Sequence, residues 1–198
     1  EPQYEVEVET DVLYGVNATI LPVLFQITME AVPEALLMDV YQPVDAPGDR
    51  PVMLVFHTGN FLPFPQNNGT GGTKEDSTVV ELCTRLAQRG YVAASLDYRL
   101  GWNPADPSQD FRKFFLINAA YRGVQDARTA VRYMRLLAED GNVQGEVNPY
   151  QIDPDKIGIW GVGTGGYIVA ATATLDAYQE IVIPKFLIDL GTGSPVPM

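Results

Sequence analysis

Short apolar runs alternate along this chain with segments whose apolar residues recur at helical spacing. Residues 52–56 and 91–96 are almost entirely apolar, as expected for strands buried on both faces of a mostly parallel sheet. A further strand is predicted at 156–160. Residues 23–28 and 35–41 are also predicted as strands, and we expect these two to pair with each other in antiparallel fashion.

Three segments are predicted as helices because their apolar residues fall on one face or follow a turn signal. The first begins with a capping box formed by Thr78 and Glu81 and ends at Gly90. The second covers residues 118–139, with apolar positions three and four apart, and the third covers 168–175. Strand and helix therefore alternate, which predicts an α/β fold with a doubly wound, mostly parallel sheet.

Composition narrows the class of protein. The 198 residues are 46% hydrophobic, so we expect one domain spanning 1–198. The formal net charge of −12 and only 13 basic residues argue against a nucleic-acid partner. No run of about eighteen apolar residues occurs, so no membrane span is expected. The single cysteine, Cys83, is predicted to be buried and inert. The chain starts at Glu1 and not at Met, which is compatible with secretion after processing.

A glycine-rich turn between the last predicted strand and helix fits two motifs. Read as G-x-G-x-x-G, Gly161, Gly163 and Gly166 match a dinucleotide fingerprint, with Asp189 at about the expected distance of twenty residues. Read as G-x-S-x-G, Gly161 and Gly165 flank a nucleophile elbow in which Gly163 stands where the serine belongs. In either case the helix that follows points free N–H groups at the turn, which suits an anion or an oxyanion.

Four segments, in order and spacing, resemble the carboxylesterase and lipase branch of the α/β-hydrolase superfamily. They are residues 37–43 (L-M-D-V-Y-Q-P), 57–60 (H-T-G-N), 97–100 (D-Y-R-L) and 152–161 (I-D-P-D-K-I-G-I-W-G). The resemblance covers about residues 35–175, whereas the dinucleotide interpretation explains only the last segment. It implies an α/β-hydrolase fold in which an H-G-G-G loop and a nucleophile elbow lie side by side.

The resemblance also implies roles for single residues. Gly59 and Asn60 correspond to the second and third glycines of H-G-G-G, and Thr164 corresponds to the residue after the nucleophile. Their backbone N–H groups would form the oxyanion hole. His57 corresponds to the loop histidine, for which we expect a structural role, because the catalytic histidine of the family comes long after the elbow. Gly161, Gly165 and Gly166 would shape the elbow.

Two departures from the family pattern bear on catalysis. Gly163 has no side chain with which to attack, and no histidine follows it. Thr164 is a weak candidate for the nucleophile, because a shifted motif would need glycine at Val162 and would put the hydroxyl in the first turn of the helix. A hydrolase of this kind also needs about three more strands after the elbow, and residues 181–198 supply at most one. The sequence therefore resembles the N-terminal part of such a domain, apparently truncated after the elbow helix.

Three functions remain open from the sequence. The first is an esterase-like protein without catalysis that binds a small ester-like ligand or a protein partner, including a missing C-terminal half or another chain. The second is an active carboxylic-ester hydrolase that uses Thr164 or residues of a missing half. The third is a dinucleotide-binding protein that uses Gly161, Gly163 and Gly166. For the first two we expect no cofactor and no metal.

Overall fold

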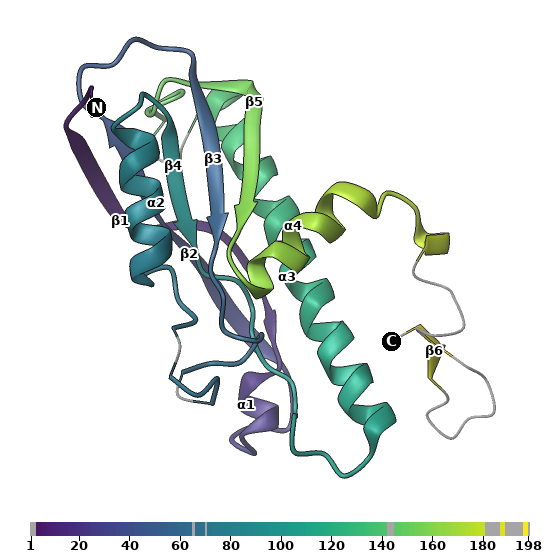
Figure 1. Cartoon of the computed structure of the whole chain (residues 1–198). Coiled ribbons are helices and arrows are strands. Elements are labelled where there is room, and N and C mark those ends of the chain that lie inside the picture. Colours follow the sequence, from purple (N-terminus) through teal and green to yellow (C-terminus); the bar gives the residue numbers. More distant parts are fainter. Residues whose placement is uncertain are drawn as a thin grey trace.

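The computed structural model describes residues 3–64, 66–69, 71–141, 145–180, 187–188 and 196–197. A five-stranded sheet of order β1-β2-β4-β3-β5 forms the centre of this part of the chain (Figure 1). Its strands are β1 (Val6–Thr19), β2 (Val32–Pro43), β3 (Arg50–Phe56), β4 (Val92–Leu96) and β5 (Ile152–Gly161). The other elements are α1 (Leu21–Leu24), α2 (Ser77–Ala87), α3 (Gln109–Glu139), α4 (Thr164–Thr174), the 3-10 helix at Tyr178–Glu180, and a small pair, β6 (Leu187–Ile188) and β7 (Val196–Pro197).

The sheet is mixed around a parallel centre. β4, β3 and β5 run parallel, whereas β2 joins β4 and β1 joins β2 in antiparallel fashion. Since parallel neighbours require crossover connections, α2 links β3 to β4 and α3 links β4 to β5. The carboxyl ends of β3 and β5 lie side by side, with Phe56 opposite Gly161. The predicted α/β class is therefore confirmed.

Helices cover both faces of the sheet, and each face has its own apolar core. On one face α3 and α4 pack over sheet side chains such as Leu54 and Leu96, and Met134 of α3 belongs to the same core. On the other face α2 packs through Val79 and Cys83. Every residue of β4 is buried, as its apolar sequence predicts for a strand covered on both sides. No helix in the described part of the chain is both long enough and apolar enough to cross a membrane.

The strand predicted at 23–28 is wrong. Residues Leu21–Leu24 form the short helix α1, with Pro22 in its first turn, and the chain then turns through Gln26, which has a φ of 58°. The partner of β2 is β1, which the apolar pattern did not predict. β1 is an edge strand whose first half alternates valine with glutamate, so its hydrophobic signal is weak.

Two helix starts also differ from the sequence prediction. α2 begins at Ser77 after Asp76, so Thr78 and Glu81 do not form the predicted capping box. α3 begins at Gln109, nine residues before the predicted start at 118, and the side chain of Ser108 caps it by accepting from the N–H of Phe111 at 3.4 Å. The added turns are rich in aromatic residues, which blurred the helical spacing.

Candidate active-site elbow and adjoining cavity

The turn between β5 and α4 has the geometry of a nucleophile elbow. Gly163 precedes the first residue of α4 with φ 55° and ψ −118°, a conformation that is strained for any residue with a side chain. A Cβ on Gly161 would overlap the backbone of Gly165. A Cβ on Gly165 would overlap the carbonyl oxygen of Phe56 and lie 2.8 Å from that of His57. Backbone therefore packs directly on backbone, and this fixes the start of α4 against the end of β3.

Thr58 lies against the elbow and was not singled out from the sequence. A Cβ built on Gly163 would overlap Thr58 Oγ1 and lie 2.8 Å from Thr58 Cβ. The space in which an elbow residue would carry its side chain is thus already occupied. The sequence does contain a signal for this residue, because Thr58 stands at the first glycine of the H-G-G-G pattern.

The loop that follows β3 is tied to the elbow and to the β4–α3 connection. Asn60 donates its backbone N–H to Thr164 Oγ1 at 3.2 Å and accepts from Trp102 Nε1 at its carbonyl at 2.8 Å. Gly59 has a φ of 120°, and a Cβ there would lie 2.8 Å from the Cα of Gly72. The structure thus brings Gly59, Asn60 and Thr164 together.

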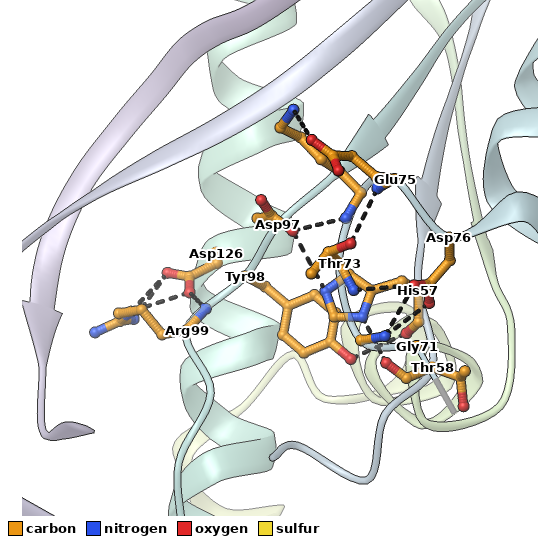
Figure 2. A network of polar contacts seen from close by, with 12 residues as sticks. His57, Thr58, Gly71, Thr73, Glu75, Asp76, Asp97, Tyr98, Arg99 and Asp126 are labelled. Carbon is orange, nitrogen blue, oxygen red and sulfur yellow. Dashed lines mark hydrogen bonds and ion pairs between the residues drawn. The ribbon is translucent and has the colours of Figure 1, made fainter. Parts of the chain in front are cut away.

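His57 is fully buried beneath this loop. Its ring stacks on Tyr98 with centroids 4.3 Å apart, its Nδ1 is hydrogen-bonded to the carbonyl of Thr58, and Tyr98 donates to the carbonyl of His57 at 3.0 Å. Its Nε2 lies 3.8 Å from Asp97 Oδ1 (Figure 2) and has no hydrogen-bond partner among the described residues. Burial lowers the pKa of His57 to about 4, so the ring is neutral at pH 7.

Acidic and basic groups anchor the far end of the loop. Lys74 is 5% exposed, and its ammonium lies 2.7 Å from Asp39 and 3.0 Å from Asp11. The backbone N–H of Lys74 donates to Asp97 at 2.7 Å. The side chain of Asp97 is 39% exposed. Its partial burial raises the pKa of the carboxyl to about 6, although the hydrogen bond from the Lys74 N–H acts in the opposite direction. Asp76 accepts from the N–H of Gly72 at 2.9 Å.

A cavity of about 530 Å³ opens beside the elbow. Its polar lining residues are Asn60 of the loop after β3 and Thr164 at the start of α4, and the other lining residues are aromatic or aliphatic. The walls are formed by Phe61, Leu62, Trp102, Leu116, Ile117, Ala120 and Tyr167. The volume lies within the range of small-molecule sites.

Comparisons with known proteins show the family and the fold. The fold and the elbow define an α/β-hydrolase of the carboxylesterase and lipase type. A sequence profile described as BD-FAE matches residues 38–184, and the chain belongs to this family. A comparison with curated proteins gives no match.

Solved structures show a similar fold. Esterase 2 of Thermogutta terrifontis phosphorylated by paraoxon is 22% identical with a TM-score of 0.51, covering 86% of this chain and 47% of that chain. Its native form gives a TM-score of 0.50 at 22% identity, covering 90% and 48%. A bacterial heroin esterase gives 0.49 at 22%, covering 92% and 42%. The chain thus spans about half the length of these structures.

The residues predicted for the dinucleotide motif are placed as follows. Gly161 ends β5, Gly163 forms the turn, and Gly166 lies in the first turn of α4, where its N–H donates to the carbonyl of Gly163 at 3.0 Å. Asp189, the predicted ribose partner, lies outside the described residues.

Proposed function

We propose that this chain is an esterase-like protein that binds a small, largely apolar ligand of ester type without hydrolysing it. The observation that carries the proposal is Gly163, a residue with no side chain at the tip of a turn that has elbow geometry. Acyl transfer on this fold requires a nucleophile at that point, a base beside it and free N–H donors for the oxyanion.

The other groups around Gly163 also argue against hydrolysis. His57 is the only histidine of the sequence, and it is buried with one ring nitrogen engaged. The N–H of Asn60, one of the two expected oxyanion donors on the loop, is already satisfied by Thr164 Oγ1. A donor that is occupied in the free protein cannot stabilise a tetrahedral intermediate unless that bond breaks first.

The cavity supports binding as the remaining activity. Its walls are aromatic and aliphatic, and its polar groups lie at the elbow end. A ligand with an apolar body could place a carbonyl near Asn60 and Thr164 while Trp102 and Tyr167 contact the body. A few polar groups at one end of an apolar cavity are typical of small-molecule sites.

Two observations argue against a threonine nucleophile and against dinucleotide binding. Thr164 Oγ1 accepts a hydrogen bond from the N–H of Asn60, and its side chain is hydrogen-bonded to Tyr98, whose pKa is raised by burial so that the phenol is not a base at pH 7. The glycine turn follows β5, the fifth strand along the chain, whereas a dinucleotide fingerprint ordinarily follows the first strand.

We further propose that additional polypeptide, either a C-terminal half or another chain, covers β5. Within the described residues, β5 pairs with β3 alone, and Trp160 on β5 is 48% exposed. An open strand edge with apolar side chains is a site for pairing with further chain. The intact mass of the native protein tests this proposal, and a mass equal to that of this chain alone, with no associated polypeptide, would contradict it.

The two tryptophans of the sequence allow a direct test of binding. Trp102 lines the cavity and Trp160 does not, so the Trp160→Phe variant reports on the cavity alone. We expect p-nitrophenyl butyrate to quench this variant saturably and to leave the Trp102→Phe variant without saturable quenching. We expect p-nitrophenol to be released no faster than in buffer. Enzymatic turnover that disappears in Thr164→Val would replace the proposal with a threonine hydrolase, and saturable quenching by NADH would favour the dinucleotide alternative.

A further inference from the structure

The space above Gly163 is blocked by one residue. A Cβ on Gly163 would overlap Thr58 Oγ1. It would also lie 2.8 Å from Thr58 Cβ and 3.7 Å from Thr58 Cα. The Cα distance is an ordinary van der Waals contact, whereas the Cβ distance is shorter than folded proteins tolerate. The conflict thus begins at the side chain of residue 58 and not at its backbone.

Rotation of Thr58 cannot remove this conflict. A change of χ1 moves Oγ1 and the methyl group, but the Cβ is fixed by the backbone. That backbone is held in place, because the ring of His57 is buried against Tyr98 and Gly165 packs on the carbonyl oxygens of Phe56 and His57. Any side chain at position 163 must therefore displace a tightly packed loop.

We propose that Thr58 closes the nucleophile position of the elbow, so that Thr58 and Gly163 act as a matched pair. A side chain fits at position 163 only when residue 58 is glycine. This inference deepens the proposed function, on which it rests: hydrolysis is prevented by the missing nucleophile and by a second residue that fills its place. Thr58 acts on position 163 by exclusion and takes no part in chemistry.

A cysteine introduced at the elbow reports on this space without needing a base. α4 has eleven residues and begins at Thr164, so a thiol at position 163 would lie at its positive end. Thiols at helix N-termini have pKa values below the ordinary 8.5 or so. The native Cys83 is fully buried, and burial raises its pKa to about 12. We therefore expect Cys83 to react with a thiol reagent only after the chain unfolds.

The experiment compares Gly163→Cys with Thr58→Gly/Gly163→Cys. We expect Gly163→Cys alone to lower the thermal midpoint by about 6–12 °C. Thr58→Gly should limit the loss to about 2–6 °C, the residual strain of a side chain at positive φ. Iodoacetamide should then modify one thiol per chain in the double variant, with an apparent pKa below 8.5, and none in folded Gly163→Cys.

The double variant should also capture an acyl group. The thiolate attacks the carbonyl carbon of p-nitrophenyl acetate, the carbon–oxygen bond breaks, p-nitrophenolate leaves and a thioester remains. We expect one p-nitrophenolate per chain and a mass increase of one acetyl group. Folded Gly163→Cys should give neither, and Thr58→Val/Gly163→Cys should match it, because valine keeps the Cβ.

Several results would overturn the inference. One is labelling of Gly163→Cys alone while Cys83 stays silent. Another is unfolding of the double variant when Thr58→Gly alone folds, and a third is a Thr58→Val variant that behaves like the glycine variant. All three are independent of ester hydrolysis and cavity binding by the native chain, so they are distinguishable from failure of the proposed function.

Discussion

Two buried polar groups lie just beyond the carboxyl ends of neighbouring strands, and they differ in how well they are satisfied. After β4, Arg99 donates to both oxygens of Asp126 at 3.0 Å and also donates to the carbonyl of Ala18 at 2.9 Å. After β3, His57 makes one side-chain hydrogen bond, and its Nε2 has no hydrogen-bond partner among the described residues. Both side chains are almost completely buried.

The difference separates scaffold from site. A buried charge is tolerated when it is paired and hydrogen-bonded, and the Arg99–Asp126 pair meets this condition while it joins α3 to the loop after β4. Leaving a buried nitrogen without a hydrogen-bond partner costs about 1–3 kcal/mol. Here that nitrogen is Nε2 of His57, at the start of the loop that adjoins the elbow. The paired Arg99 thus stabilises the packing of α3 on the sheet, whereas the unsatisfied Nε2 of His57 lies next to the elbow.

The largest expected effect comes from breaking the scaffold pair. Asp126→Ala leaves Arg99 buried without its counter-charge, so we expect a loss of about 3–5 kcal/mol in the free energy of unfolding by urea denaturation. The matched control is Glu81→Ala, which breaks an exposed pair with Arg85 at 2.6 Å and should cost less than about 1 kcal/mol. Equal losses in the two variants would contradict the stabilising role assigned to the buried Arg99–Asp126 pair.

A second variant tests how tightly the elbow is packed. Gly165→Ala places a Cβ 2.8 Å from the carbonyl oxygen of His57 and into that of Phe56, so α4 must shift away from β3. We expect a loss of about 3 kcal/mol. Gly48→Ala is the control, because its Cβ would meet nothing closer than 3.7 Å and should cost less than about 1 kcal/mol. A tolerated Gly165→Ala would mean that the elbow is not tightly packed.

The pH dependence of stability tests the site side of the comparison. The folded pKa of His57, about 4, lies below its ordinary value of about 6.5, so the unfolded chain takes up the proton first as pH falls. Proton uptake by His57 alone should therefore lower the free energy of unfolding between pH 6.5 and 4, by about 2 kcal/mol at pH 5 relative to pH 7. The neighbouring Asp97, whose folded pKa is raised to about 6, acts in the opposite direction over this range and is present in both the native chain and the His57→Gln variant. His57→Gln removes the proton uptake by His57.

The measurement is the difference in unfolding free energy between the native chain and His57→Gln at each pH. At pH 7 the variant should be the less stable, because it loses the stacking on Tyr98. That gap should narrow by about 2 kcal/mol at pH 5. A gap that is constant with pH would show that His57 titrates normally and is not sealed beneath the loop.

Much of the fold was predictable because its central elements have simple hydrophobic patterns. β3 and β4 are continuous apolar runs, and the second half of α3 has clear helical spacing. β1 was not predicted because an edge strand exposes one side to water and needs little apolar surface. α1 was mistaken for a strand because apolar residues near 21–25 fit either element when a run is short.

The candidate site was predictable only as far as motifs reach. Gly161, Gly163 and Gly165 could be placed because a tight strand–turn–helix needs them at fixed spacing. The effect of Thr58 on the elbow could not be predicted from the sequence, because it depends on a contact with Gly163, more than a hundred residues away. The occupied N–H of Asn60 depends on the same kind of contact, with Thr164. Motifs specify local backbone, whereas the packing between two loops requires the fold.

The smallest expected effect concerns that contact between the loop and the elbow. Thr164→Val keeps the shape of the side chain but removes the oxygen that accepts from the N–H of Asn60 at 3.2 Å. Asn60 is exposed, so its N–H can turn to water, and we expect a loss of only about 1 kcal/mol. Thr174→Val, at the other end of α4, removes a hydroxyl that bonds within the helix at 2.8 Å and serves as the control at less than about 0.5 kcal/mol. Amide hydrogen exchange at Asn60 should accelerate in Thr164→Val and stay unchanged in the control, because only the first variant frees that N–H. Unchanged exchange at Asn60 would mean that this N–H is already free in solution and could bind a ligand in the native chain.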